Sequence, residues 1–221
     1  MAPCEFRLNQ LGEALRLYLV TDQGCTQGRR LQEVVAAAVL GGVTCVQLRE
    51  KHLNTHDFLA QSIALKELLS PLGIALVIND RIDIALACGA HGVHLGQSDM
   101  PVEVARRLLP PDVFIGWSVE TLDDVKCSAH LPVDYLGVSP IFETPTKKDI
   151  ATPWGLSGLR QVRTMTTLPL VAIGGIHLSN AQEVLAAGAD GLAVVSALCA
   201  VADPCAAAKS FRNILRLQHS S

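Results

Sequence analysis

The stretch Leu86-Ala-Cys-Gly-Ala-His-Gly-Val93 and its near copy Leu185-Ala-Ala-Gly-Ala-Asp-Gly-Leu192 decide the fold. In each copy an amphipathic run ends at a Gly-Ala pair, and an apolar run begins directly after it. A glycine in this place is typical of a helix end, and the apolar run is typical of a buried strand. Val39-Leu-Gly-Gly-Val43 is a looser third copy. The chain therefore repeats a unit of helix, stop and strand.

Eight apolar runs have the length and composition of buried strands. They are Leu17–Asp22, Val43–Glu50, Ala75–Asp80, Gly92–Gly96, Phe114–Ser118, Asp134–Pro140, Pro169–Gly175 and Gly191–Leu198. Eight such strands, separated by amphipathic helices, predict an α/β fold with a single (β/α)8 TIM barrel. We expect one domain over residues 1–221. Its core would cover about 15–217, after an N-terminal tail of about 14 residues.

A doubly wound open sheet is the competing architecture. Its nucleotide-binding form would carry G-x-G-x-x-G after the first strand, and Thr21-Asp-Gln-Gly-Cys25 does not supply that pattern.

Composition excludes several classes of protein. The 221 residues are 49% hydrophobic and 18% charged, which excludes a disordered chain, and the net charge of −3 comes without a basic run for nucleic acid. The longest apolar stretch, Gly191–Ala202, is too short to span a membrane, and Glu5 and Arg7 interrupt any secretory signal. None of the seven cysteines forms a C-x-x-C pair. We therefore expect a cytoplasmic protein with no nucleic-acid or membrane partner.

The end of the second predicted strand carries two cations. In Cys45-Val-Gln-Leu-Arg-Glu-Lys51, strand alternation places Gln47, Arg49 and Lys51 on one face. Active sites of barrels lie where the strands end, so this face points into the barrel mouth. Two cations in one place repel each other unless an anion lies between them, and phosphate or diphosphate fits. A solvated charge run at a strand exit is the alternative.

The third and fourth predicted strands lead to two carboxylates. Asp80 ends Val77-Ile-Asn-Asp80, and Asp99 follows His94-Leu-Gly-Gln-Ser98. Neighbouring strands bring these side chains together, and Mg²⁺ commonly takes one or two carboxylates plus phosphate oxygens of a substrate. Asn79 would add a neutral donor. Taken singly, each aspartate has helix capping as its alternative role.

The remaining strand ends offer hydroxyl and backbone groups. Ser118 lacks the last glycine of a nucleophile elbow, so we interpret it as a hydrogen-bond donor. In the long polar loop 139–148, Thr144, Thr146 and Lys147 could close over a phosphorylated substrate. The Gly174–Gly175 pair and Ser196 follow the last two strands, where barrels often bind phosphate through backbone N–H groups. For each of these, an ordinary loop or cap is the alternative.

The histidines give no metal site by their spacing. His91 and His94 are three apart around a strand and would point to opposite faces, and His52 and His56 lack a third ligand nearby. With no clear nucleophile or general base, the site is expected to stabilise a leaving diphosphate electrostatically.

These segments together resemble the thiamine-phosphate synthase family. The resemblance runs from Leu17 to about Leu198 with the motifs in order, and it rests on Gln47–Lys51, Val77–Asp80, Gly92–Asp99, Pro140–Lys148, Ile173–Ile176 and Val195–Ser196. It implies a (β/α)8 barrel that condenses hydroxymethylpyrimidine diphosphate with a thiazole phosphate. The products are thiamine phosphate and diphosphate. Loss of diphosphate comes first, assisted by Mg²⁺, and leaves a cation that the thiazole nitrogen captures.

The resemblance also implies roles for individual residues. The pyrimidine diphosphate would be held by Gln47, Leu48, Arg49, Glu50, Lys51, Asn79 and Lys147. Mg²⁺ would be held by Asp80 and Asp99, and Ser118 would lie at the pyrimidine and the departing oxygen. The thiazole phosphate would be held by Thr144, Pro145, Thr146, Gly175, Val195 and Ser196. Catalysis would rest on Arg49, Lys51, Ser118 and Lys147.

The chain departs from the family pattern at three positions, which are Glu120, Glu143 and Ser139. A carboxylate at position 120 would repel an anionic substrate. We therefore expect the Glu120 side chain to point away from the substrate.

Two other functions stay open at this stage. A related thiazole tautomerase would bind a thiazole phosphate on the same barrel, but it would need no diphosphate site such as Arg49 and Lys51 facing Asp80 and Asp99. A non-catalytic phosphate-binding barrel is the third possibility. The sequence leaves formation of a homo-oligomer open.

Overall fold

Eight parallel strands close into a barrel in the order β1 to β8, with β8 paired to β1. The computed structural model describes residues 10–143 and 152–217. The strands are β1 (Leu17–Val20), β2 (Cys45–Leu48), β3 (Ala75–Asn79), β4 (Gly92–Leu95), β5 (Phe114–Val119), β6 (Tyr135–Val138), β7 (Leu170–Ile173) and β8 (Gly191–Val194). This confirms the predicted (β/α)8 barrel.

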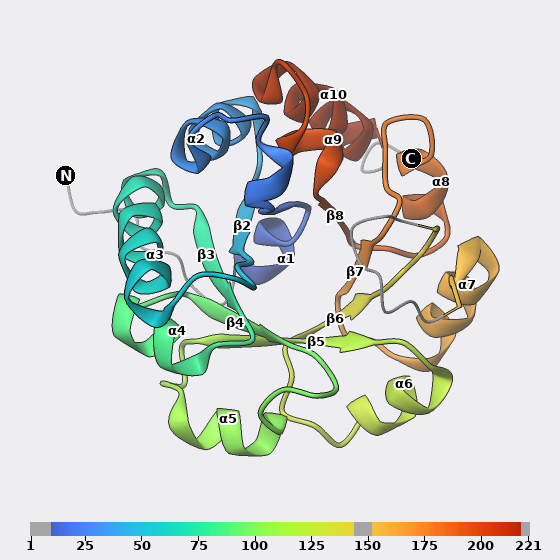
Figure 1. Ribbon diagram of the computed structural model, residues 1–221. Helices are drawn as coiled ribbons and strands as arrows, with labels where there is room; N and C mark the ends of the chain where they lie inside the picture. Colours follow the sequence, from blue (N-terminus) through green and yellow to red (C-terminus); the bar gives the residue numbers. More distant parts are fainter. Residues whose placement is uncertain (1–9, 144–151, 218–221) are drawn as a thin grey trace.

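Helices surround the barrel on its outer side (Figure 1). The α-helices are α1 (Leu11–Ala14), α2 (Leu31–Gly41), α3 (Thr55–Leu69), α4 (Ile82–Cys88), α5 (Val102–Leu108), α6 (Leu122–Ser128), α7 (Gly155–Met165), α8 (Ala181–Ala186), α9 (Ser196–Cys199) and α10 (Pro204–Leu217). Two short 3₁₀ turns, η2 (Gln23–Cys25) and η3 (Ser70–Leu72), complete the described elements. Within the described ranges, no helix is long and apolar enough to cross a membrane.

Strand alternation separates two apolar cores. Leu17 and Leu19 point outward into the layer beneath the helices, whereas Tyr18 and Val20 point into the barrel. The inner core also contains Phe114 from β5. The short helix α1, which lies inside the ring of helices in Figure 1, contributes the buried Ala14 to this inner core. The described end of the segment expected as a tail, residues 10–14, therefore supplies part of the barrel filling.

Four side chains close the amino-terminal edge of the barrel. Each precedes an even-numbered strand and accepts the backbone N–H of the first or second residue of the preceding strand, at 2.7–2.9 Å; they are Thr44, His91, Asp134 and Asp190. The backbone N–H of the same four residues donates back to that strand at 2.8–2.9 Å. We call these side chains the amino-terminal clamps. His91 and Asp190 occupy the same place in the two sequence copies, so the repeat encodes a clamp that satisfies the strand edge.

Candidate active site

The predicted site residues gather in a polar cavity at the carboxyl-terminal end of the barrel. It measures about 360 Å³ and is lined by residues that include Gln47, Arg49, Lys51, Asn79, Asp80, Asp99 and Ser118. These residues lie at or just after the carboxyl ends of strands β2, β3 and β5. Asp99 lies further along the chain, four residues beyond the end of β4. The structure therefore brings together the cations, the carboxylates and the hydroxyl that the sequence placed in one site.

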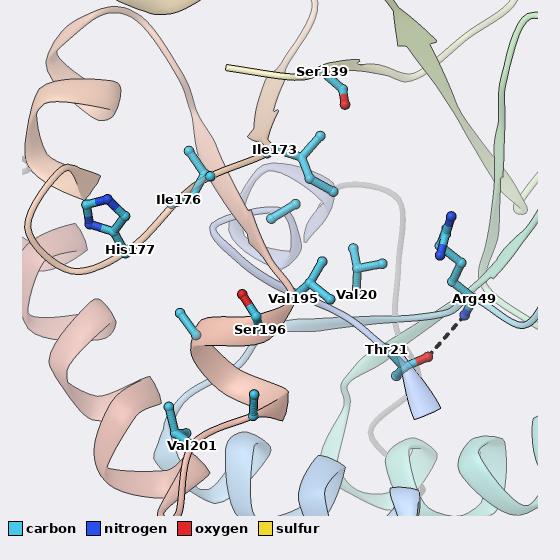
Figure 2. A pocket seen from close by; sticks show the side chains of 15 residues that line it. Val20, Thr21, Arg49, Ser139, Ile173, Ile176, His177, Val195, Ser196 and Val201 are labelled. Atoms are coloured by element: carbon cyan, nitrogen blue, oxygen red, sulfur yellow. Dashed lines mark hydrogen bonds between the residues drawn. The ribbon is translucent and has the colours of Figure 1, made fainter. Parts of the chain in front are cut away.

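Gln47 and Arg49, at the carboxyl end of β2, are each held by a hydrogen bond to β1 or to the residue after it. Gln47 is only 5% exposed, and its Nε2 donates to the Tyr18 hydroxyl at 3.0 Å. The Arg49 backbone N–H donates to Thr21 Oγ1 at 3.1 Å, which fixes the chain where the arginine leaves the strand (Figure 2).

Leu48 and Glu50, which the resemblance implies as substrate contacts, are not among the residues that line the two cavities, and that role stays a prediction. Leu48 is fully buried in the core beneath the helices, and Glu50 is absent from the lining of the cavities described here. Their side chains point to the face opposite Arg49. Burial raises the pKa of Glu50, with the Asp22 charge as a smaller cause.

Asp80 occupies an unusual backbone position. Its φ of +62° is in the left-handed region, and Arg81 N–H donates to the Asn79 carbonyl at 2.7 Å around it. Side chains other than glycine seldom adopt this conformation, although aspartate and asparagine do so more often than most. The turn aims the carboxyl group into the polar cavity instead of along the next helix.

Neither predicted metal ligand is a helix cap. The residues at the cap positions are Arg81 for α4 and Pro101 for α5, and neither helix has a side-chain cap hydrogen bond. Asp99 Oδ2 instead accepts the Gly96 N–H of its own loop at 2.6 Å. The capping alternative is therefore excluded for both aspartates.

The two carboxyl groups are close enough to influence each other's ionisation. Burial raises the pKa of Asp80 to about 6, and a hydrogen bond and negative charge from Asp99 add to that rise. The charges of Lys51 and Arg49 act in the opposite direction. Two carboxyl groups in contact favour the binding of a cation between them.

His94, whose spacing from His91 gave no metal site, lines the polar cavity. His94 Nε2 is 2.9 Å from Ser118 Oγ, and its Nδ1 is 2.9 Å from the Tyr135 hydroxyl. His91 lies instead at the opposite end of the barrel as a clamp, so the two do not form a metal site. Strand alternation, applied to Gln47, would also have placed His94 inside the barrel. Val93 and Leu95 on either side of it point into the outer core.

Glu120 is among the residues that line the polar cavity, and the direction of its side chain stays a prediction.

A second, apolar cavity of about 370 Å³ adjoins the polar one. Its lining includes Gly174, Gly175, Val195 and Ser196, and Figure 2 shows Val20 and Val195 between Arg49 and Ser196 in that view. The two cavities share Val20, Arg49, Ser139, Ile173 and Ala193. Two ligands bound in them would therefore meet at a common wall beside Arg49.

The glycine pair carries a structural requirement of its own. Gly174 and Gly175 have φ of +100° and +66°, and a Cβ on Gly174 would lie 2.8 Å from Pro140 Cβ. The same atom on Gly175 would lie 2.9 Å from the Glu143 carbonyl oxygen. The two glycines are therefore required for close contact with the segment after β6. The close approach of a ligand, which the sequence suggested, would be a second reason for glycine here. The residues expected to follow it, Thr144, Pro145, Thr146 and Lys147, lie outside the described residues.

Among the described residues, no group of three or more His, Cys, Asp or Glu side chains could hold a metal ion. A cation held by Asp80 and Asp99 would therefore need oxygen ligands from a bound substrate or from water.

Comparison with known proteins identifies close relatives. The thiamine monophosphate synthase family model matches residues 17–198. The thiamine-phosphate synthase of Albidiferax ferrireducens is 77% identical over 92% of this chain and 93% of its own length. The thiamine-phosphate synthase of Vibrio parahaemolyticus is 48% identical over 91% of this chain and 98% of its own length.

Solved structures agree with the sequence comparisons. The thiamine phosphate pyrophosphorylase of Pyrococcus furiosus superposes with a TM-score of 0.86 at 37% identity, covering 94% of this chain and 98% of that one. A 3-hexulose-6-phosphate synthase from Salmonella typhimurium has a TM-score of 0.72 at 18% identity, covering 92% and 99% of the two chains. The second likeness concerns the fold alone.

Proposed function

The chain belongs to the thiamine monophosphate synthase family, and we propose how its two cavities divide that family's reaction between them. The enzyme condenses hydroxymethylpyrimidine diphosphate with a thiazole phosphate, giving thiamine phosphate and diphosphate. The observation that carries the assignment of the site is the meeting of Asp80 and Asp99 with Arg49 and Lys51 in one cavity.

The polar cavity is assigned to the pyrimidine diphosphate. Arg49 and Lys51 supply charge-assisted hydrogen bonds to its phosphate oxygens, and Arg can do so with two parallel N–H groups. Gln47 and Asn79 are buried amides at the same wall and would orient the neutral part of the substrate. Lys147 would add a third cation from the loop after β6.

Mg²⁺ fits the donors present at this site. Asp80 and Asp99 are hard oxygen ligands, their carboxyl groups interact, and the raised pKa of Asp80 reflects burial beside a like charge. Mg²⁺ held by these two carboxylates would neutralise charge on the leaving group. Oxygen atoms of the substrate would have to complete its coordination, because the described residues supply only two carboxylate ligands.

The apolar cavity is assigned to the thiazole phosphate. Val20, Ile173 and Val195 provide apolar walls for a ring, and Gly175 and Ser196 lie where barrels bind phosphate. Thr144, Pro145 and Thr146 would complete that phosphate site. The shared wall of the two cavities would hold the thiazole nitrogen facing the pyrimidine methylene carbon.

The reaction then proceeds without a protein nucleophile. The bond between the methylene carbon and the diphosphate oxygen breaks, and its electron pair leaves with that oxygen. Arg49, Lys51 and the Ser118 hydroxyl stabilise the negative charge, and the thiazole nitrogen forms the new bond to carbon. The pair Ser118–His94 does not constitute a nucleophilic triad, because His94 Nδ1 contacts a tyrosine hydroxyl where a triad would have a carboxylate.

The test is formation of thiamine phosphate from the two substrates. The assay would contain the full chain, both substrates and Mg²⁺, and a parallel reaction would contain EDTA. Metal-dependent product supports the proposal. Binding of the thiazole phosphate without product would instead favour a tautomerase or a non-catalytic phosphate-binding barrel. We also propose a cytoplasmic location, in keeping with the unpaired cysteines.

A further inference from the structure

A continuous chain of hydrogen bonds runs across the floor of the polar cavity and ends at Ser118. Gln47 Nε2 donates to the Tyr18 hydroxyl at 3.0 Å, and the Tyr18 and Tyr135 hydroxyls lie 3.1 Å apart. The Tyr135 hydroxyl is 2.9 Å from His94 Nδ1, and His94 Nε2 is 2.9 Å from Ser118 Oγ. Five side chains from strands β1, β2, β4, β5 and β6 thus form one path.

The barrel is built to hold this path in place. Tyr18 and Tyr135 are 1% and 0% exposed, and they are the two tyrosines of the whole chain. A Cβ on Gly116 would lie 2.0 Å from Tyr135 Cζ, and a Cβ on Gly137 would lie 2.8 Å from His94 Cε1. Both rings therefore occupy space that only glycine leaves, on the adjacent strand β5 for Tyr135 and on β6, two strands away, for His94. Gln97 Nε2 also donates to the Ser118 carbonyl at 2.8 Å and fixes the end of the path.

The first donor sets the direction of the whole path. The Gln47 amide N–H can only donate, so the Tyr18 oxygen accepts from it. If Tyr18 then donates to Tyr135, and Tyr135 to His94 Nδ1, every hydroxyl donates once and accepts once. His94 Nε2 must then carry the ring hydrogen and donate to Ser118 Oγ. In the reverse direction Tyr18 would accept twice, and its own hydrogen would be left to the neighbouring Cys45 thiol, a weak acceptor.

We infer that Gln47, Tyr18, Tyr135 and His94 are positioning residues that turn the Ser118 hydroxyl hydrogen into the polar cavity. Because Ser118 Oγ already accepts from His94, its hydrogen is directed to a substrate acceptor. On the proposed function, that acceptor is the diphosphate oxygen that gains an electron pair as its bond to carbon breaks. No proton is transferred in this step, since the hydroxyl stabilises the departing oxygen by a hydrogen bond alone.

The tautomer of His94 tests this direction without any substrate. Long-range ¹H–¹⁵N NMR of the full chain labelled at histidine distinguishes the two ring nitrogens, and a His94→Gln variant identifies the His94 signals. We expect a neutral ring with hydrogen on Nε2. Hydrogen on Nδ1, on both nitrogens or on a mixture of the two would overturn the inference, whether or not the enzyme makes thiamine phosphate.

Two matched Tyr→Phe substitutions test the role in the reaction. Tyr135→Phe removes the donor to His94, so kcat should fall at least about 10-fold while KM for the pyrimidine diphosphate changes little. Tyr18→Phe leaves the Tyr135 hydroxyl in place but removes the donor that directs it, so kcat should fall by a smaller factor, about three- to tenfold. Equal losses in the two variants, with equal losses in stability, would show a structural role only and overturn the inference.

A double substitution separates positioning from packing. In a Ser118→Ala background, Tyr135→Phe should cause no further loss of kcat, because the hydroxyl that it orients is gone. If the kcat losses of the two single variants multiplied in the double variant, the inference would be overturned. A wild-type enzyme that yields no thiamine phosphate would instead contradict the proposed function, and the NMR result would still decide the direction of the path.

Discussion

The two ends of the barrel treat polar groups in opposite ways. At the amino-terminal edge, Thr44, His91, Asp134 and Asp190 each accept a strand N–H and donate their own N–H back. At the carboxyl-terminal edge, burial and the charge of Asp99 raise the pKa of Asp80, and Arg49 and Lys51 line the same cavity. The first edge is completed by the protein itself, whereas the second is completed by what it binds.

This contrast separates residues that stabilise the fold from residues that perform the chemistry. Substitution of a clamp should reduce stability and spare the reaction. Substitution at the cavity should abolish the reaction and leave the fold as stable as before, or more so, because strained and repelling groups are typical of functional sites.

The largest expected effect is that of Asp80→Asn. Asparagine also tolerates the left-handed backbone at this position, so the fold is kept while one metal-binding oxygen and the charge are lost. Activity should fall at least about 100-fold, since the diphosphate would lose its bridging cation. Without ligands the variant should be more stable at pH 7 by about 1 kcal/mol, a modest gain because solvent screens the partly exposed carboxyl. Steady-state kinetics and urea unfolding would check both, and wild-type turnover would refute the metal role.

Arg49→Ala should produce the next largest effect. Loss of a charge-assisted hydrogen bond should weaken binding of the pyrimidine diphosphate by about 1.5–3 kcal/mol, roughly 10- to 150-fold in Kd. Calorimetry would measure it, with Arg106→Ala as control, because Arg106 contacts Asp134 near the opposite edge. Equal affinities of wild type and Arg49→Ala would remove Arg49 from the site.

Asp134→Ala should show the reverse pattern from Asp80→Asn. The Ile115 N–H, now bonded to Asp134 Oδ2 at 2.7 Å, would lose its acceptor. We expect a loss of about 1–3 kcal/mol in the free energy of unfolding, measured by urea titration, with kcat within about twofold of wild type. A large loss of kcat with unchanged stability would mean that the two ends are not separate in function.

The smallest expected effect is a dependence of stability on pH at His91. Burial, with the Lys66 charge as a smaller cause, lowers the pKa of His91 to about 4. The unfolded side chain takes up a proton near pH 6.5, so this histidine stabilises the fold above that pH and the contribution is lost as pH falls toward 4.

His91→Asn keeps an acceptor for the Leu76 N–H but cannot be protonated in this range. Urea unfolding from pH 6.5 to 4 should therefore show a shallower decline for the variant, by no more than about 3 kcal/mol over the window. Identical declines for the two proteins would exclude His91 as the source.

The fold followed from the sequence because its signals are local. A glycine that ends a helix and an apolar run that starts a strand are written in consecutive residues, and Asp203–Pro204 likewise marks the start of α10. The predicted end of the last strand, Leu198, was wrong, because β8 ends at Val194 and α9 follows. The apolar run continues from the strand into this helix without a change in composition. Burial by itself does not distinguish these two structures.

The site was predictable only where strand parity or strand adjacency could be applied. Parity placed Gln47, Arg49 and Lys51 together, and the adjacency of β3 and β4 placed Asp80 near Asp99; both sets line one cavity. The path from Tyr18 through Tyr135 to His94 joins strands far apart in the sequence, and it depends on the space left by Gly116 and Gly137. Such contacts depend on the closure of the barrel, which no local pattern describes.

The most direct test of the account is the binding of inorganic diphosphate by wild type and by Asp80→Asn, each with and without excess Mg²⁺. Calorimetry should show that Mg²⁺ tightens diphosphate binding to the wild-type protein at least about tenfold, a gain of about 1.4 kcal/mol. The account predicts that Asp80→Asn loses this gain and retains the weaker, metal-free affinity that Arg49 and Lys51 provide. An equal gain in both proteins would contradict it.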